Sequence, residues 1–261
     1  MSEVGSTVIL CGGRGTRLQE HTRTIPKALV EIGGRPILWH VIRIYAAQGL
    51  RGFVLSTGYL GGMIEEYVAA ETWPDGVDIE CVDTGLDTPT GGRVKLVADR
   101  LSDGTFCATY ADGVADIDLG ALIGFHRDHG DLATVTVVRP RSQFGVAELG
   151  PDGRVTEFHE KPRLDHWVNG GFFCFESGVF DYLDESSVLE DEPLERLTSE
   201  RRLRAYRHDG FWDCMDTYKD AVVLNDLWNG GEAPWRIWDD DLQASAAARL
   251  DVGDGGESGV G

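Results

Sequence analysis

The feature that most constrains the fold is a regular alternation of short apolar runs with amphipathic stretches over residues 7–138. The apolar runs, which we expect to be strands, lie at 7–11, 52–57, 77–82, 105–109 and 132–138. Stretches with helical spacing lie between them, at 36–48, 61–70, 92–101 and 119–129. This β-α-β-α order predicts an α/β fold with a mixed, mostly parallel sheet and helices on both of its faces.

The pattern changes after Arg139. We expect a hairpin from strands at 145–149 and 154–159, a strand at 171–175 and a late strand at 203–207. Helices are expected at 177–184, 193–201 and 219–228. No linker rich in Pro or Ser divides the halves, so residues 1–238 are predicted to form a single domain, with 140–238 extending a core formed by about 1–139. Residues 239–261 are acidic and of low complexity, and their composition is typical of disorder.

The charge balance limits the possible partners. Lys and Arg number 24 against 44 Asp and Glu, a formal net charge of −20. A field of this sign repels nucleic acid and anionic membranes, so neither is expected as a partner. No apolar run approaches the ~20 residues of a membrane span, and we expect no signal peptide. The five cysteines are scattered singly, without a CxxC motif, which favours reduced thiols in a cytoplasmic protein.

Against this acidic background, the loop after the first strand is basic and rich in glycine. It reads "CGGRGTRL" at residues 11–18, and Lys27 follows. Glycines allow backbone N–H groups to approach an anion closely, and the nearby cations suit phosphate oxygens. The spacing matches neither the GxxxxGK[ST] of a P-loop nor GxGxxG. Taken alone, the loop is better explained as a tight strand exit with solvated arginines than as a phosphate site.

The wider context carries a family resemblance. "GGRGTRL…PKALVEIGGRPILWH" is followed in order by "VDTG…TGGRVK", "ADGVADID", "EKP", "NGGFF", "GFWDCMDT" and "LWNGGEAPWRIW". This series resembles the sugar-phosphate nucleotidyltransferases from Val8 to Trp238, and in detail the glucose-1-phosphate cytidylyltransferases. The resemblance implies a Rossmann-like, GT-A-like fold with a nucleotide-binding core and a small β-rich sugar-binding extension. It also implies a homo-oligomer and a reaction that joins a nucleoside triphosphate to a sugar 1-phosphate and releases pyrophosphate.

The resemblance assigns roles to particular residues. Arg17 would hold the β- and γ-phosphates, Lys27 would reach the α-phosphate, and Asp112 is the third catalytic residue. Asp112 and Asp216 would bind Mg²⁺, although an Asp after a strand is often only a turn or helix cap. The other substrate-binding residues implied in this way are Leu10, Cys11, Gly12, Gly13, Arg14, Gly15, Thr16, Thr88, Arg93, Ala111, Gly145, Glu160, Lys161, Asn169 and Gly170.

The chain departs from the family pattern at Cys11, Ile25, Ala28-Leu29 and Ala111, and the segment before "VDTG" is short. CTP and α-glucose 1-phosphate are the favoured substrates. Another nucleotide, or a modified sugar or cyclitol phosphate, remains an alternative. A non-catalytic nucleotide-sugar-binding protein is less favoured, and a Rossmann dehydrogenase lacks its glycine motif. We interpret "HRDH" (126–129) as a solvated helix end and the late tryptophans as packing of the C-terminal segment.

Overall fold

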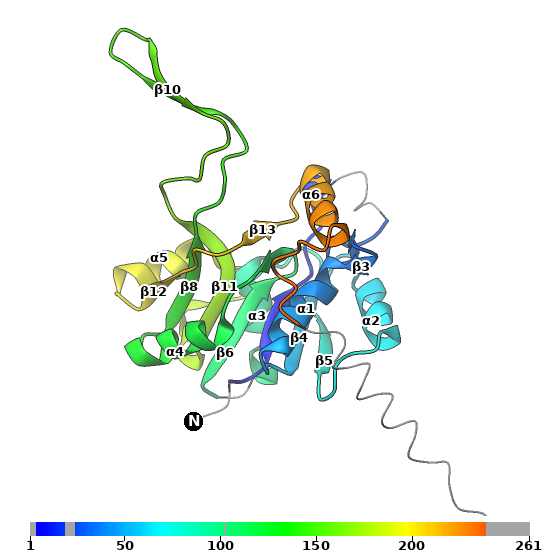
Figure 1. Cartoon of the computed structure of the whole chain (residues 1–261). Helices are drawn as coiled ribbons and strands as arrows, with labels where there is room; N and C mark the ends of the chain where they lie inside the picture. The colour runs from blue at the N-terminus through cyan, green and yellow to red at the C-terminus, as the bar shows by residue number, and fades with distance from the viewer. Residues whose placement is uncertain (1–3, 19–23, 102, 239–261) are drawn as a thin grey trace, which may run out of the picture.

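The computed structural model describes residues 4–18, 24–101 and 103–238, and its centre is one mixed sheet (Figure 1). The described strands of this sheet lie in the order β12-β8-β11-β6-β1-β4-β5. Neighbouring strands are parallel except where β11 pairs with β6 and β8. The expected fold class is therefore confirmed. The strands are β1 (Thr7–Leu10), β4 (Gly52–Thr57), β5 (Asp78–Asp83), β6 (Thr105–Tyr110), β8 (Ala133–Val138), β11 (Val168–Glu176) and β12 (Leu203–Arg207).

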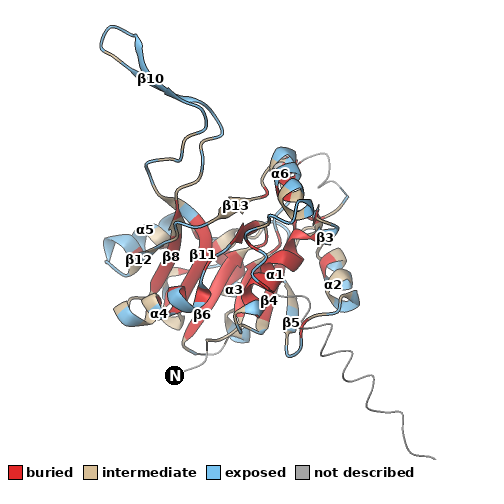
Figure 2. Cartoon of the chain, viewed as in Figure 1, coloured by how far each residue is buried: buried red, intermediate tan, exposed pale blue. Residues whose placement is uncertain are grey.

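Helices cover both faces because successive strand residues point to opposite sides. Val8 packs in one hydrophobic cluster and its neighbour Ile9 in the other. The Ile9 cluster takes residues from α1 (Ile37–Ala47), α2 (Gly61–Ala70), α4 (Leu119–His129) and α6 (Tyr218–Asn229). The Val8 cluster takes residues from α3 (Thr90–Leu96) and α5 (Glu192–Ser199). Figure 2 shows the buried strands lying between these two layers.

A hairpin of β9 (Val146–Leu149) and β10 (Val155–His159) projects from this body (Figures 1 and 2). Every residue of both strands is exposed. The hairpin was expected from the turn residues "GPDG", and Gly153 takes the positive φ of +80° that such a turn requires. Its position far from the body could not be read from the sequence.

Several short elements were not expected. They are the strand pairs β2 (Glu31–Ile32) with β3 (Arg35–Pro36) and β7 (Gly113–Ala115) with β13 (Trp212–Cys214), and the 3₁₀ turns η1 (Thr16–Leu18), η2 (Lys27–Leu29) and η3 (Ala98–Arg100). The helix expected at 177–184 is instead the 3₁₀ segment η4 (Ser177–Tyr182). Two- and three-residue strands carry no periodicity, so only their partners far along the chain reveal them.

The structure corrects one minor interpretation and supports another. His126 is not solvated: it is 1% exposed and bonds Thr134 and Glu176. The late tryptophans pack as expected, with Trp235 and Trp238 against α1. The five cysteines are free thiols, of which Cys81 and Cys214 are only half-buried. No helix among the described residues has the length and apolarity to cross a membrane. Residues 239–261, the predicted disordered tail, lie outside the described residues.

Candidate active site

A cavity of about 600 Å³ lies where β1 and β6 end. These two strands are parallel, so their carboxyl ends meet at one edge of the sheet, where open α/β folds bind ligands. Many of the residues predicted to bind substrate line it: Leu10, Cys11, Gly12, Gly13, Arg14, Gly15, Thr16, Lys27, Thr88, Arg93, Ala111, Asp112 and Asp216. The fold thus brings together segments that lie up to two hundred residues apart.

The glycine-rich loop forms one wall of this cavity. Gly15 has a positive φ of +59°, and its carbonyl accepts a hydrogen bond from Leu18 N at 3.0 Å, which starts η1. Gly13 is exposed, with open space where a Cβ would lie. Arg14 reaches across to Asp87 at 3.1 Å, and both side chains are exposed. The side chain of Arg17 lies outside what the structure describes, so its predicted phosphate contact stays a prediction.

Arg93 supports this loop from beneath. Its guanidinium is buried and donates to Gly12 O at 3.1 Å, Thr57 O at 2.8 Å and Thr84 Oγ1 at 2.6 Å. Burial lowers the pKa of Arg93, and the nearby Asp83 partly offsets this. A Cβ on Gly12 would lie 1.9 Å from the Arg93 guanidinium. Arg93 therefore borders the cavity, as predicted, but its hydrogen bonds fix the backbone around the loop.

Lys27 joins two carboxylates at the floor of the cavity. Its Nζ lies 2.5 Å from Asp112 Oδ2 and 2.7 Å from Asp216 Oδ1, and its side chain is 17% exposed. Burial opposes the charge on Lys27, but Asp112 and Asp216 outweigh burial and raise its pKa. The amine is thus a fixed cation at the place where a phosphate group would meet the two carboxylates.

The unexpected pair β7 and β13 explains how Asp112 and Asp216 meet. Gly113 pairs with Cys214, and Met215 N donates to Asp112 O at 2.9 Å. Asp216 directly precedes α6, whose first turn is closed by a capping box of Thr217 and Asp220. Asp220 Oδ2 also accepts from Asp216 N at 3.2 Å. The strand pair β7–β13 therefore holds the backbone at Asp112, and the capped first turn of α6 holds the backbone at Asp216.

Cys11 and Ala111 line the same floor and are both buried. Cys11 Sγ donates to Ile9 O at 3.5 Å, and burial raises the pKa of its thiol, so the sulfur stays neutral. Thr88 donates to Thr84 O at 2.5 Å and so helps to hold the opposite wall. None of these three residues adds a charge to the cavity.

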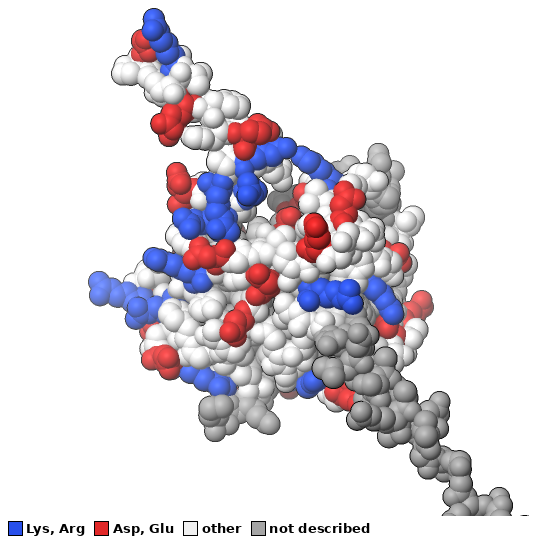
Figure 3. Space-filling view, in the orientation of Figure 1, with Lys and Arg blue, Asp and Glu red and all other residues white. Residues whose placement is uncertain are grey.

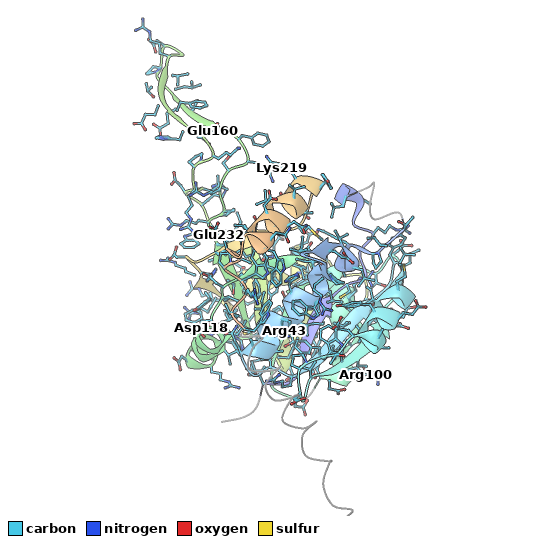
Figure 4. All side chains as sticks on the ribbon, turned by 45° about the vertical axis from the view of Figure 1, so that its right-hand side comes forward. Arg43, Arg100, Asp118, Glu160, Lys219 and Glu232 are labelled. Atoms are coloured by element: carbon cyan, nitrogen blue, oxygen red, sulfur yellow. The ribbon has the colours of Figure 1, made fainter. Side chains whose placement is uncertain are left out.

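The residues predicted to contact the sugar fall into two groups. Asn169 and Gly170 lie on β11 beside the cavity, and Asn169 Nδ2 donates to Tyr110 Oη at 3.3 Å. Gly170 is buried, and its carbonyl accepts from Trp212 Nε1 at 2.7 Å. Gly145, Glu160 and Lys161 instead lie on the projecting hairpin or at its base, and none of them lines the cavity. Figure 4 shows Glu160 on this projecting hairpin of β9 and β10, which we call the arm, away from the body.

On the arm, Glu160 and Lys161 face each other. Lys161 Nζ lies 3.7 Å from Glu160 Oε1. The side chain of Lys161 is 51% exposed and that of Glu160 is 66% exposed. A Cβ on Gly145 would lie 2.5 Å from the ring of Phe158, so this glycine lies directly beside that ring within the hairpin. Within this single chain the structure does not bring these three residues to the cavity.

Sequence reasoning missed several residues of the cavity wall. Tyr110 could have been found, because it ends the strand that leads to Ala111 and Asp112. The missed residues among 86–90 could also have been found, because they lie directly before the glycines of the motif "TGGRVK". Glu190, which bonds Tyr110 and Thr90, gave no such signal. The missed lining residues are Ala28, Leu86, Asp87, Pro89, Thr90 and Tyr110.

The comparisons with known proteins agree with this geometry. A family model described as "Nucleotidyl transferase" matches residues 6–230. The chain therefore belongs to the nucleotidyl transferase family, and the predicted enzyme class is confirmed.

Two relatives narrow the resemblance further. A "Probable glucose-1-phosphate cytidylyltransferase" of Bacillus subtilis (strain 168) is 42% identical over 252 residues, covering 88% of this chain and 99% of the relative. A "Glucose-1-phosphate cytidylyltransferase" of Salmonella typhimurium is 41% identical over 259 residues, covering 89% and 99%. The resemblance to this subfamily is thus confirmed.

Among solved structures, HddC from Yersinia pseudotuberculosis complexed with GMP-PN superposes with a TM-score of 0.68 at 22% identity. The match covers 85% of this chain and 99% of that one. At this identity the likeness concerns the fold alone.

Proposed function

We propose that this protein joins CTP to α-glucose 1-phosphate, with release of pyrophosphate, to make CDP-glucose. The observation that carries the proposal is the meeting of Lys27, Asp112 and Asp216 opposite the glycine-rich loop, in one cavity. The names of the two cytidylyltransferase relatives supply the choice of nucleotide and sugar.

In the reaction, an oxygen of the sugar phosphate attacks the α-phosphorus of the nucleotide in line. A new P–O bond forms as the bond from the α-phosphorus to the pyrophosphate oxygen breaks. Negative charge grows on the α-phosphate and the leaving group, so fixed cations and N–H donors lower the barrier. In this proposal Lys27 would contact the α-phosphate, and Arg17 would hold the β- and γ-phosphates beyond it. No covalent nucleophile is needed.

We further propose that Asp112 and Asp216 hold Mg²⁺. Their carboxylates fit, because Asp112 Oδ2 and Asp216 Oδ1 converge and both lie within 2.7 Å of Lys27 Nζ. Hard oxygen ligands of this kind suit Mg²⁺. Mg²⁺ usually completes its shell with waters and substrate phosphates, which agrees with a site of two protein ligands. When bound, the ion would neutralise charge on the phosphate oxygens.

We also propose a cytoplasmic homo-oligomer in which the hairpin packs against a second copy. The hairpin exposes large apolar side chains, with Phe144 75%, Leu149 68% and Phe158 63% exposed. An isolated two-stranded hairpin is marginal in water, so a partner surface would stabilise it. Basic side chains gather at its base (Figure 3), a sign that suits the acidic surface of another copy. Docked in this way, Glu160 and Lys161 would approach a neighbour's sugar site.

The alternatives concern substrate rather than chemistry. Cys11 and Ala111 line the cavity and differ from the family pattern, and Ile25 replaces a cation near η2. Another nucleotide, or a modified sugar or cyclitol phosphate, is therefore the second candidate. A non-catalytic nucleotide-sugar binder is disfavoured, because Lys27 and both carboxylates are in place.

Pyrophosphate release with each nucleoside triphosphate and a panel of sugar 1-phosphates, in the presence of Mg²⁺, tests the proposal. We expect the highest kcat/KM with CTP and α-glucose 1-phosphate. Selective turnover with ATP or GTP would keep the reaction and reject CTP, whereas no turnover with any pair would reject the enzyme assignment.

A further inference from the structure

A chain of hydrogen bonds runs along the wall between the nucleotide segment and the sugar segment, and at its centre is Glu190, which was not among the predicted site residues. Glu190 accepts from Thr90 Oγ1 at 2.6 Å through Oε2 and from Tyr110 Oη through Oε1. Tyr110 Oη in turn accepts from Asn169 Nδ2 at 3.3 Å. Thr90 and Tyr110 line the cavity, so one carboxylate ties its nucleotide wall to Asn169.

The direction of every proton in this chain is determined. Asn169 Oδ1 accepts from Gly171 N at 2.8 Å, so the Nδ2 atom is the one that donates to Tyr110 Oη. Tyr110 Oη has one proton, which it donates to Glu190 Oε1, and a lone pair of the same oxygen accepts from Asn169 Nδ2. Glu190 accepts at both of its oxygens, which keeps the whole chain in this direction.

Tight packing holds Glu190 in place. Leu189 is fully buried, and its N–H donates to Thr90 Oγ1 at 2.9 Å. Gly92 N donates to Ser187 O at 2.9 Å, and a Cβ on Gly92 would lie 2.2 Å from Glu185 O. The glycines of "TGGRVK" therefore admit the backbone of the 185–190 segment. The ring of Tyr110 is placed as firmly, because a Cβ on Gly171 would lie 2.6 Å from it.

We propose that Glu190 is a positioning residue for the sugar phosphate: through Tyr110 it orients the Asn169 amide, whose second N–H then points to a ligand oxygen. The inference rests on the proposed function, because it takes Asn169 as a sugar contact. The hydrogen bond from Thr90 to Glu190 also connects the Asn169 amide to the cavity wall that the nucleotide would contact.

Glu190→Gln is the direct test. A glutamine of the same size can accept from only one of the two hydroxyls, since its amide nitrogen must donate. We expect the KM for α-glucose 1-phosphate to rise by about five- to tenfold, which corresponds to the loss of roughly one ordinary hydrogen bond. The KM for CTP should change by less than about twofold, because Leu189 N still donates to Thr90 Oγ1 and holds the side chain of Thr90 on the nucleotide wall. Glu192→Gln is the matched control, because this exposed neighbour pairs only with Arg196 among the contacts described.

Tyr110→Phe removes the link and serves as a second variant should Glu190→Gln unfold. It should raise the sugar KM by a similar factor. In the double variant, Glu190→Gln should add less than about twofold to the effect of Tyr110→Phe, because the two residues act through one path. An unchanged sugar KM, an equal rise for CTP, or independent effects of the two substitutions would overturn the inference. Lack of turnover in the wild type would instead reject the proposed function.

Discussion

The two sides of the proposed reaction are built in different ways. On the nucleotide side, the loop after β1 and the end of β6 continue buried parallel strands, and the Lys27 turn joins the same hydrophobic core through Ala28, so all three line one cavity within one chain. On the sugar side, Asn169 and Gly170 lie on β11, which is antiparallel to both of its neighbours, whereas Glu160 and Lys161 lie on the exposed arm. The hydrophobic core therefore fixes the nucleotide half of the site, whereas part of the sugar half depends on the surface against which the arm packs.

The largest effect is expected from breaking the nucleotide side at Lys27. Lys27→Ala should cost roughly 2–4 kcal/mol of transition-state stabilisation, a fall in kcat of about 30- to 10³-fold, because a preorganised cation is lost. Lys219→Ala is the control, since Lys219 is exposed on α6 close to Asp216 in sequence (Figure 4). Steady-state kinetics with saturating CTP and sugar phosphate measure both, and a near-wild-type kcat for Lys27→Ala would remove it from the mechanism.

The body should also be the acid-sensitive region. His40 is fully buried in α1, donates from Nε2 to Ile32 O and accepts from Trp235 Nε1. Burial lowers its pKa to about 4 from 6.5. Between these values the unfolded chain binds the proton more tightly, so stability is full above pH 6.5 and falls by about 3 kcal/mol as the pH drops to 4.

Urea unfolding followed by tryptophan fluorescence at pH 7 and pH 4.5 measures this loss. His159, 56% exposed on the arm, provides the contrast: His159→Gln should leave the pH dependence as it is. His40→Gln should flatten it, and an unaltered slope in that variant would show that other groups cause the acid sensitivity.

A smaller effect is expected where the loop meets Arg93. Gly12→Ala places a methyl group against the buried guanidinium and should lower the free energy of unfolding by about 1–3 kcal/mol. Gly13→Ala next to it meets open space and should change stability by less than about 0.5 kcal/mol. Thermal unfolding of the two variants compares them directly, and equal losses would contradict a supporting role for Arg93.

The smallest effect on stability is expected on the arm. Phe158→Ser should change the free energy of unfolding of the single chain by less than about 0.5 kcal/mol, because the ring is 63% exposed. It should nevertheless weaken association, since a partner would bury that ring. Sedimentation velocity of wild type and variant at several concentrations tests this, and an unchanged assembly would show that the arm is not the interface.

Much of the fold and half of the site followed from local pattern. The periodicity of residues 7–138 predicted the parallel core, because alternating strands and helices signal themselves by their own spacing. The family motifs named Lys27, Asp112 and Asp216, and the chain brings these three into contact. The pairing of β7 with β13, which joins the two carboxylates, involves three residues on each side and has no local signature.

The sequence by itself thus determined the α/β architecture, the cavity at the strand ends and the cations around the glycine-rich loop. Only the tertiary structure decided three further points: that Arg93 supports the loop, that Glu190 links Thr90 to Tyr110, and that Glu160 and Lys161 project away from the cavity. The physical reason is that periodicity reports which face of an element is buried. Which distant backbone or side chain fills that face is decided by packing.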